Sequence, residues 1–110
     1  MATNYKRAGV QGTASTGTYT TLYQVPAGTQ AVISTIAICN TASAAATYRI
    51  GFDDTEGTPG ASEWLIYDAT VAPNDTVFLS VGAALAAEKY VRVSSSADTA
   101  TFQAFVSEIS

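Results

Sequence analysis

No histidine occurs among the 110 residues, and cysteine occurs once. A chain without histidine has no imidazole general base near neutral pH, no histidine-activated serine or cysteine nucleophile, and no histidine-ligated zinc site. One cysteine, Cys39, cannot form an internal disulfide or a multi-cysteine zinc site. The phosphate-binding patterns GxxxxGK[ST] and GxGxxG are missing as well. Together these absences predict a protein that is not an enzyme and carries no cofactor.

Charge is also scarce, at 13% of residues against the usual quarter, while 47% of residues are hydrophobic and the net charge is −4. The surface must therefore be built from Thr, Ser, Ala and Gly, which can pack against other proteins at little desolvation cost. Nucleic acids and anionic membranes need a basic patch to neutralise phosphates. The basic residues are instead scattered, so neither is expected as a partner. They are Lys6, Arg7, Arg49, Lys89 and Arg92.

Long hydrophobic runs are missing too, so we expect no transmembrane helix. The first seven residues are polar and lack the apolar core of a signal peptide, which predicts synthesis in a cytoplasm. Cys39 follows the apolar residues Ile36–Ile38 and is predicted to be a buried small hydrophobe rather than a reactive thiol.

Short alternating segments rich in Val, Ile, Thr, Tyr and Phe recur along the chain between Gly, Pro, Asn, Asp and Ser clusters. This pattern predicts an all-β fold, a single antiparallel β-sandwich of about eight strands, jelly-roll-like or Ig-like. A turn of helix is conceivable at 82–88. The predicted strands are 5–10, 18–25, 30–40, 47–53, 62–68, 76–81, 90–94 and 99–109.

The alternation also predicts which side chains face the core. Val32, Ile36 and Ile38 are expected on one face of their strand. Trp64 is predicted to be the central aromatic residue of the core. Tyr67 would then lie on the opposite face and becomes a candidate contact residue. In 47–53, Tyr48, Ile50 and Phe52 are expected to point inward and Arg49 outward.

The chain divides into an N-terminal arm or edge strand with its connector, residues 1–17, and a sandwich domain, residues 18–110. Tyr5, Lys6 and Arg7 lie in the polar N-terminal stretch. Such an arm could add as an edge strand to a neighbouring subunit, so these three residues are candidate protein-interface residues.

Asp53, Asp54 and Glu56 form the densest polar cluster, beside the flexible Gly57. Three carboxylates within four residues could ligate calcium through oxygen atoms. Their spacing does not match an EF-hand, however, and a solvated turn explains the cluster equally well. They remain a weak metal candidate, and no metal is predicted.

Two stretches carry a resemblance to a known group. The first is LYQVPAGTQAVIS at 22–34, followed by 36–40 and a small-residue loop; the second comprises 66–68, 73–76, 91–93 and 102–109. Over residues 18–109 the chain resembles small structural proteins of tailed bacteriophages.

This resemblance implies a component of the virion that is made in the host bacterial cytoplasm. The first hypothesis is a capsid decoration (cement) protein that binds the major capsid protein and forms a homo-oligomer, for which a trimer is plausible. The alternative is a structural or adhesive module of the tail or its fibres, which could bind a glycan through Tyr67 and the loops 53–61 and 82–88. A soluble non-viral sugar-binding module is a third hypothesis and would need an exposed aromatic platform.

Overall fold

The structure consists of strands and loops. The computed structural model describes residues 3–55, 57–60 and 62–110, and within these ranges there is no helix, hence none long and apolar enough to cross a membrane. The predicted all-β class and the eight strands are confirmed. The strands are β1 (Thr3–Gln11), β2 (Thr20–Gln24), β3 (Gln30–Asn40), β4 (Ala46–Asp53), β5 (Trp64–Val71), β6 (Thr76–Leu85), β7 (Tyr90–Ser95) and β8 (Ala100–Ile109).

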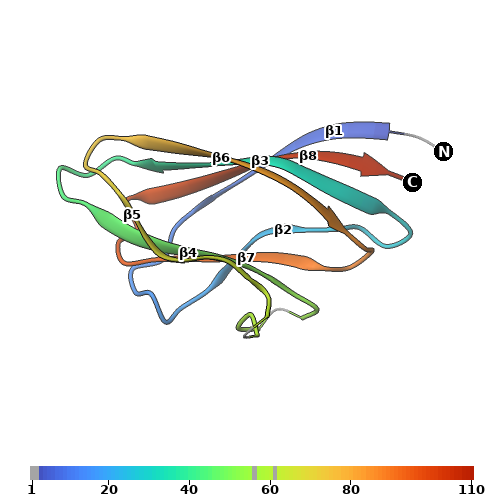
Figure 1. The fold of residues 1–110 in the computed structure, drawn as a ribbon, viewed down its shortest axis with the longest axis horizontal. Helices are drawn as coiled ribbons and strands as arrows, with labels where there is room; N and C mark the ends of the chain where they lie inside the picture. Colours follow the sequence, from blue (N-terminus) through green and yellow to red (C-terminus); the bar gives the residue numbers. More distant parts are fainter. Residues whose placement is uncertain (1–2, 56, 61) are drawn as a thin grey trace.

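The strands form two antiparallel four-stranded sheets, in the orders β1-β8-β3-β6 and β2-β7-β4-β5. Figure 1 shows the sheets as two layers, with both termini at the same end of the molecule. The first strand pairs with the last, the second with the seventh, the third with the sixth and the fourth with the fifth. This wrapped order is that of a jelly roll rather than of an Ig domain, whose sheets contain ABED and CFG.

The core lies between the two sheets and takes side chains from both. Its aromatic centre is a pair of rings, Tyr48 from one sheet and Phe102 from the other, with centroids 6.2 Å apart and an interplanar angle of 70°. As predicted, Tyr48 and Ile50 are buried, and Phe52 packs against the core. The prediction that Trp64 is the central core residue is wrong. Trp64 is only half-buried, because it lies on the outside of its sheet over Gly51.

A β-bulge in β3 changes which of its residues face the core. Relative to β8, β3 has one extra residue, Ser34, between Ile33 and Thr35. An extra residue inverts the alternation, so Ile33 rather than Val32 joins Ile36 on the buried side. The prediction for Val32 is therefore wrong. Cys39, expected to be buried, is half-buried on the outward side, because it alternates with buried neighbours.

The segment predicted to allow a helical turn, 82–88, belongs largely to β6. Ala83, Ala84 and Leu85 pair with β3, which extends the strand to Leu85. Gly82 has a φ of 63°, a conformation that glycine adopts at no steric cost. Cross-strand pairing thus outweighs the helix propensity of the alanine-rich stretch.

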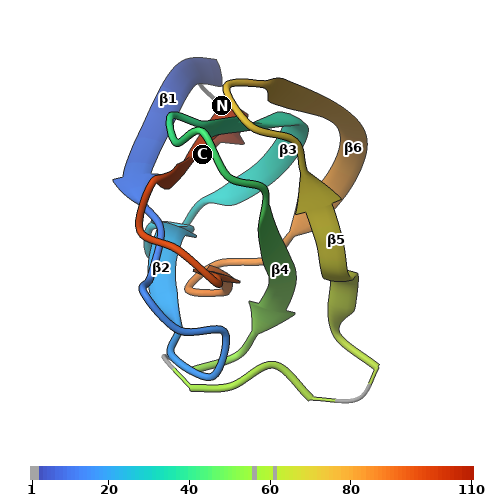
Figure 2. The same cartoon turned by 90° about the vertical axis from the view of Figure 1, so that its left-hand side faces the viewer.

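The N-terminal segment forms an edge strand of the chain's own sheet. β1 pairs with β8 without interruption from Thr3 opposite Ile109 to Gln11 opposite Thr101. The connector after it is tied down by Gly12, whose N–H donates to the Ala100 carbonyl at 2.7 Å, and by Thr13, whose hydroxyl donates to the Ser95 carbonyl at 3.1 Å. In Figure 2 this connector runs from β1 in one layer to β2 in the other.

Candidate functional site

The outward side of the β1-β8-β3-β6 sheet, called here the open face, is the first candidate surface. Because side chains alternate along a strand, its residues are those that alternate with the buried ones on these four strands. Strand register places them in cross-strand rows. The two central rows are Arg7, Phe105, Thr35 and Ser80, and Gly9, Gln103, Ala37 and Phe78.

Aromatic side chains stand exposed on the open face. Phe78 is 70% exposed, Phe105 38% and Tyr5 83%. Arg7 is the one charged residue at the outward positions of the four strands. A surface with a single charged residue and exposed phenylalanine rings is typical of a protein-contact surface.

The outward side of the other sheet is partly covered by the chain itself. Arg92, which is buried, donates to the carbonyls of Tyr19 and Gly57 at 3.3 and 3.1 Å and to the Thr21 hydroxyl at 2.6 Å. Tyr19 ends the connector between β1 and β2, and Gly57 lies in the loop between β4 and β5. A single guanidinium therefore holds two loops against this sheet.

Arg49 organises a second cluster on the same side, around a bulge in β5. Tyr48 pairs with Ala69 and Ile50 with Ile66, so Arg49 alone faces two residues, Tyr67 and Asp68. Asp68 adopts a φ of 56°, a left-handed conformation that Asp tolerates better than most residues. The bulge thereby directs both the Tyr67 ring and the Asp68 carboxylate toward the same side chain.

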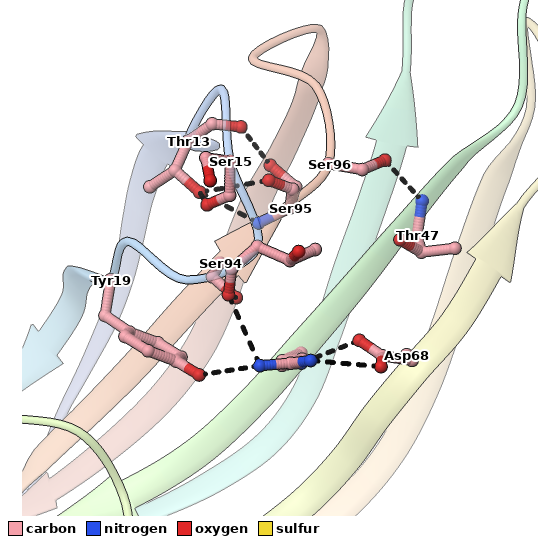
Figure 3. Close-up of polar contacts among 10 residues, drawn as sticks. Thr13, Ser15, Tyr19, Thr47, Asp68, Ser94, Ser95 and Ser96 are labelled. Carbon is pink, nitrogen blue, oxygen red and sulfur yellow. Dashed lines mark hydrogen bonds and ion pairs between the residues drawn. The ribbon is translucent and has the colours of Figure 1, made fainter.

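The Arg49 guanidinium contacts several groups at once. It forms a bidentate ion pair with Asp68 at 2.6 and 3.1 Å, donates to the Tyr19 hydroxyl at 3.0 Å, and stacks on the Tyr67 ring at 4.0 Å from the centroid. Figure 3 shows Tyr19 and Asp68 on opposite sides of the group that they bind. The hydrogen bonds raise the pKa of Arg49 and lower that of Asp68. The cluster is therefore a clamp with its polar groups already paired.

Tyr67, the predicted contact residue, belongs to this clamp. It is 57% exposed, but one face of its ring lies against Arg49. Trp64 meets the Tyr67 ring at a centroid distance of 4.9 Å and the Tyr19 ring at 5.8 Å. The aromatic rings are thus packed against one another and against a cation, rather than laid out as a flat platform for a sugar.

The acidic cluster is divided between different partners. The Asp53 carboxylate accepts from the Thr55 N–H at 3.3 Å, and Asp54 pairs with Lys89 at 2.6 Å. Glu56 lies outside the described residues. Among the residues that the structure does describe, no group of three His, Cys, Asp or Glu side chains is placed to hold a metal ion.

Of the N-terminal candidates, Tyr5 and Arg7 belong to the open face, whereas Lys6 points to the other side of β1. The Lys6 ammonium pairs with Glu108 at 2.9 Å, and Glu108 also accepts a hydrogen bond from the Tyr23 hydroxyl. Glu108 is 4% exposed. The Tyr23 hydrogen bond, helped by Lys6, lowers the pKa of Glu108 against the opposing effect of burial. This triad ties β1 and β8 to β2 in the other sheet.

Replacing Glu108 by glutamine is expected to lower the free energy of unfolding at neutral pH by about 2 kcal/mol, because two charge-assisted contacts of a buried group are weakened. Since the folded-state pKa of Glu108 lies below the unfolded one, this stabilisation is present above the unfolded pKa and is lost as the pH falls through the folded pKa. Urea titrations at several pH values should therefore show that the free energy of unfolding falls more steeply with decreasing pH for the wild type than for Glu108→Gln.

The exposed Asp98 offers a matched control, because Asp98→Asn removes the same charge and should change stability by less than about 0.5 kcal/mol. If the free energies of unfolding of Glu108→Gln and the wild type decrease in parallel as the pH is lowered, Glu108 does not cause the loss of stability in acid.

Phe78 and Phe105 were not singled out from the sequence, although a signal for them exists. Val77 and Leu79 flank Phe78, and Ala104 and Val106 flank Phe105. Because these flanking residues face the core, strict alternation turns both rings outward.

No known protein family, curated protein or solved structure matches this chain.

Proposed function

We propose that this protein is a non-enzymatic structural protein of a tailed-phage particle, a capsid decoration protein that binds the major capsid shell through its open face. The observation that carries the proposal is the open face itself. It presents exposed Phe78 and Phe105 among small uncharged side chains, with Arg7 as its charged residue.

The dimensions of the open face suit such a role. In Figure 1 the two sheets are seen edge-on along the shortest axis, so each face spans the longest and shortest extents, 45 and 18 Å. This outline of roughly 800 Å² matches what one partner contributes to an interface of ordinary size. Binding there desolvates few charges, so burial of the aromatic rings contributes favourably with little to offset it.

The jelly-roll order of the strands agrees with the proposal by analogy, because viral capsid proteins use this architecture. Lectin domains use it as well, so the fold by itself does not separate the two roles. The resemblance of residues 18–109 to small phage structural proteins favours the virion, and the already paired polar groups of the Arg49 clamp favour protein contact over sugar binding.

The test is the copy number of this protein in purified particles, measured by quantitative mass spectrometry against the major capsid protein. A number comparable with that of the major capsid protein is expected. A far smaller number would place the protein on the tail or its fibres, as in the alternative hypothesis. Absence from particles would contradict a virion role.

A variant tests the surface. Particles assembled without this protein should bind the purified wild type, whereas Phe78→Glu should bind at least about tenfold more weakly because it buries an unpaired charge in the contact. Thr70→Glu is the matched control, since it introduces the same charge on the outward side of the other sheet. Equal binding of Phe78→Glu and the wild type would exclude the open face.

A further inference from the structure

The free edge of β1 differs from the other three sheet edges. Among the described residues the edge strands are β1, β6, β2 and β5. The other three edge strands are irregular. The pairing of β2 with β7 is interrupted between Thr21 and Tyr23, and the pairing of β6 with β3 is interrupted opposite Ser34. The pairing of β5 with β4 is interrupted at the Asp68 bulge. Bulges of this kind protect edges against pairing with another chain. β1 has nine residues in unbroken register and no bulge, and of its two charged residues, which can also protect an edge, Lys6 is already paired with Glu108.

The first half of β1 is also exposed on both of its faces. All residues from Thr3 to Arg7 are exposed, and the Lys6 side chain remains 51% exposed even within its ion pair. A strand that has one neighbour and buries neither face gains little from ordering its backbone. A second strand on its free side would supply the missing hydrogen bonds.

The backbone groups available at this edge follow from the ladder. The Gly12 N–H donates to the Ala100 carbonyl in the same register as the β1–β8 pairing. Because antiparallel residues alternate between bonded and non-bonded pairs, the odd-numbered residues of β1 turn their N–H and C=O groups away from β8. Tyr5, Arg7 and Gly9 therefore present unpaired backbone groups at the free edge.

We propose that β1 is a self-association edge, at which β1 of a second copy of this chain adds antiparallel about a two-fold axis. The two sheets β1-β8-β3-β6 then become one continuous eight-stranded sheet.

Self-complementarity of the strand identifies the second copy as the occupant. Tyr5 and Arg7 are two residues apart on the same side of β1. A two-fold axis at Lys6 places Tyr5 of each copy opposite Arg7 of the other, so two cation–π pairs form. Arg7 has no ion pair among the described residues and only a 3.4 Å hydrogen bond to Gln103, and Tyr5 is 83% exposed, so both side chains are available. The two Lys6 side chains would meet near the axis, where each is already paired with Glu108.

This inference stands independently of the proposed function, because it concerns only the purified chain. Sedimentation velocity over a range of concentrations should show the wild type converting from 11.4 kDa to twice that mass. In the dimer, hydrogen exchange at the backbone amides of Tyr5 and Gly9 should slow as the concentration rises. A wild type that stays monomeric, or a dimer whose Tyr5 and Gly9 amides exchange freely, would overturn the proposal.

Arg7→Pro is the decisive variant, because it removes an outward N–H and places a ring at the edge without breaking a backbone hydrogen bond to β8; only the exposed 3.4 Å side-chain bond to Gln103 is lost. It should be monomeric, with the thermal midpoint that the wild type has at concentrations where the wild type is itself monomeric. Arg7→Ala keeps the backbone and removes the cation–π partner together with the 3.4 Å bond to Gln103 of the same chain, so it should weaken self-association by about tenfold.

Ser80→Pro provides the matched control at the free edge of β6. The Asn40 N–H donates to the Asp75 carbonyl in the β3–β6 register, so Ser80 likewise turns its backbone away from β3. Ser80→Pro should dimerise like the wild type. If Arg7→Pro dimerises as well as the wild type, or if Ser80→Pro dissociates the dimer equally, β1 is not the self-association edge.

Discussion

Replacing Phe102 by alanine is expected to lower the free energy of unfolding by about 3–5 kcal/mol. Phe102 is fully buried and makes an edge contact with Tyr48 from the opposite sheet. Its removal leaves a cavity between sheets that cannot collapse without shifting β8, which pairs with both β1 and β3. Since small domains are stable by only about 5–15 kcal/mol, the variant should unfold at a much lower temperature or urea concentration.

Phe105→Ala on the same strand is the matched control, because the same ring is removed from the outward side of the sheet. Its cost should stay near 1 kcal/mol or below. Urea unfolding followed by circular dichroism measures both variants. Equal losses for the two would show that the assignment of inner and outer faces of β8 is wrong.

Replacing Gly12 by alanine is expected to cost about 2–3 kcal/mol, although only one methyl group is added. The added Cβ would lie 2.2 Å from the Ser95 hydroxyl oxygen and 2.4 Å from the Ala100 carbonyl oxygen. The backbone must therefore move apart, which weakens the hydrogen bond from the Gly12 N–H to that carbonyl. This bond begins the connector between β1 and β2. The far end of the connector, which Arg92 holds against the β2-β7-β4-β5 sheet through the Tyr19 carbonyl, should therefore loosen as well.

Gly17→Ala, in the same connector, controls for the general effect of adding a methyl group. An added Cβ there meets nothing within 4 Å, so stability should be unchanged or rise by up to about 1 kcal/mol through loss of unfolded-state freedom. Thermal melts of the two variants give the comparison. A Gly12→Ala variant as stable as Gly17→Ala would contradict the close approach at Gly12.

The candidate surfaces were partly accessible from sequence. The polarity of Tyr5, Lys6 and Arg7 indicated an exposed edge strand, and Tyr5 and Arg7 do reach the open face. The register decided that Lys6 points to the other side and pairs with Glu108. That pairing could not be foreseen, because the two residues are 102 positions apart in the chain.

The sequence by itself determined the all-β class and the eight strands, because alternation with a period of two is a local property that turn residues delimit. The bounds of β3 and the inward-facing residues of β4 follow directly from this alternation. Only the tertiary structure decided which strands pair and where bulges fall. One extra residue, Ser34, moves Val32 outward and Ile33 into the core, and the bulge at Asp68 builds the Arg49 clamp. The reason is physical: faces depend on register, register depends on partners distant in the chain, and a shift of one residue inverts every side chain beyond it.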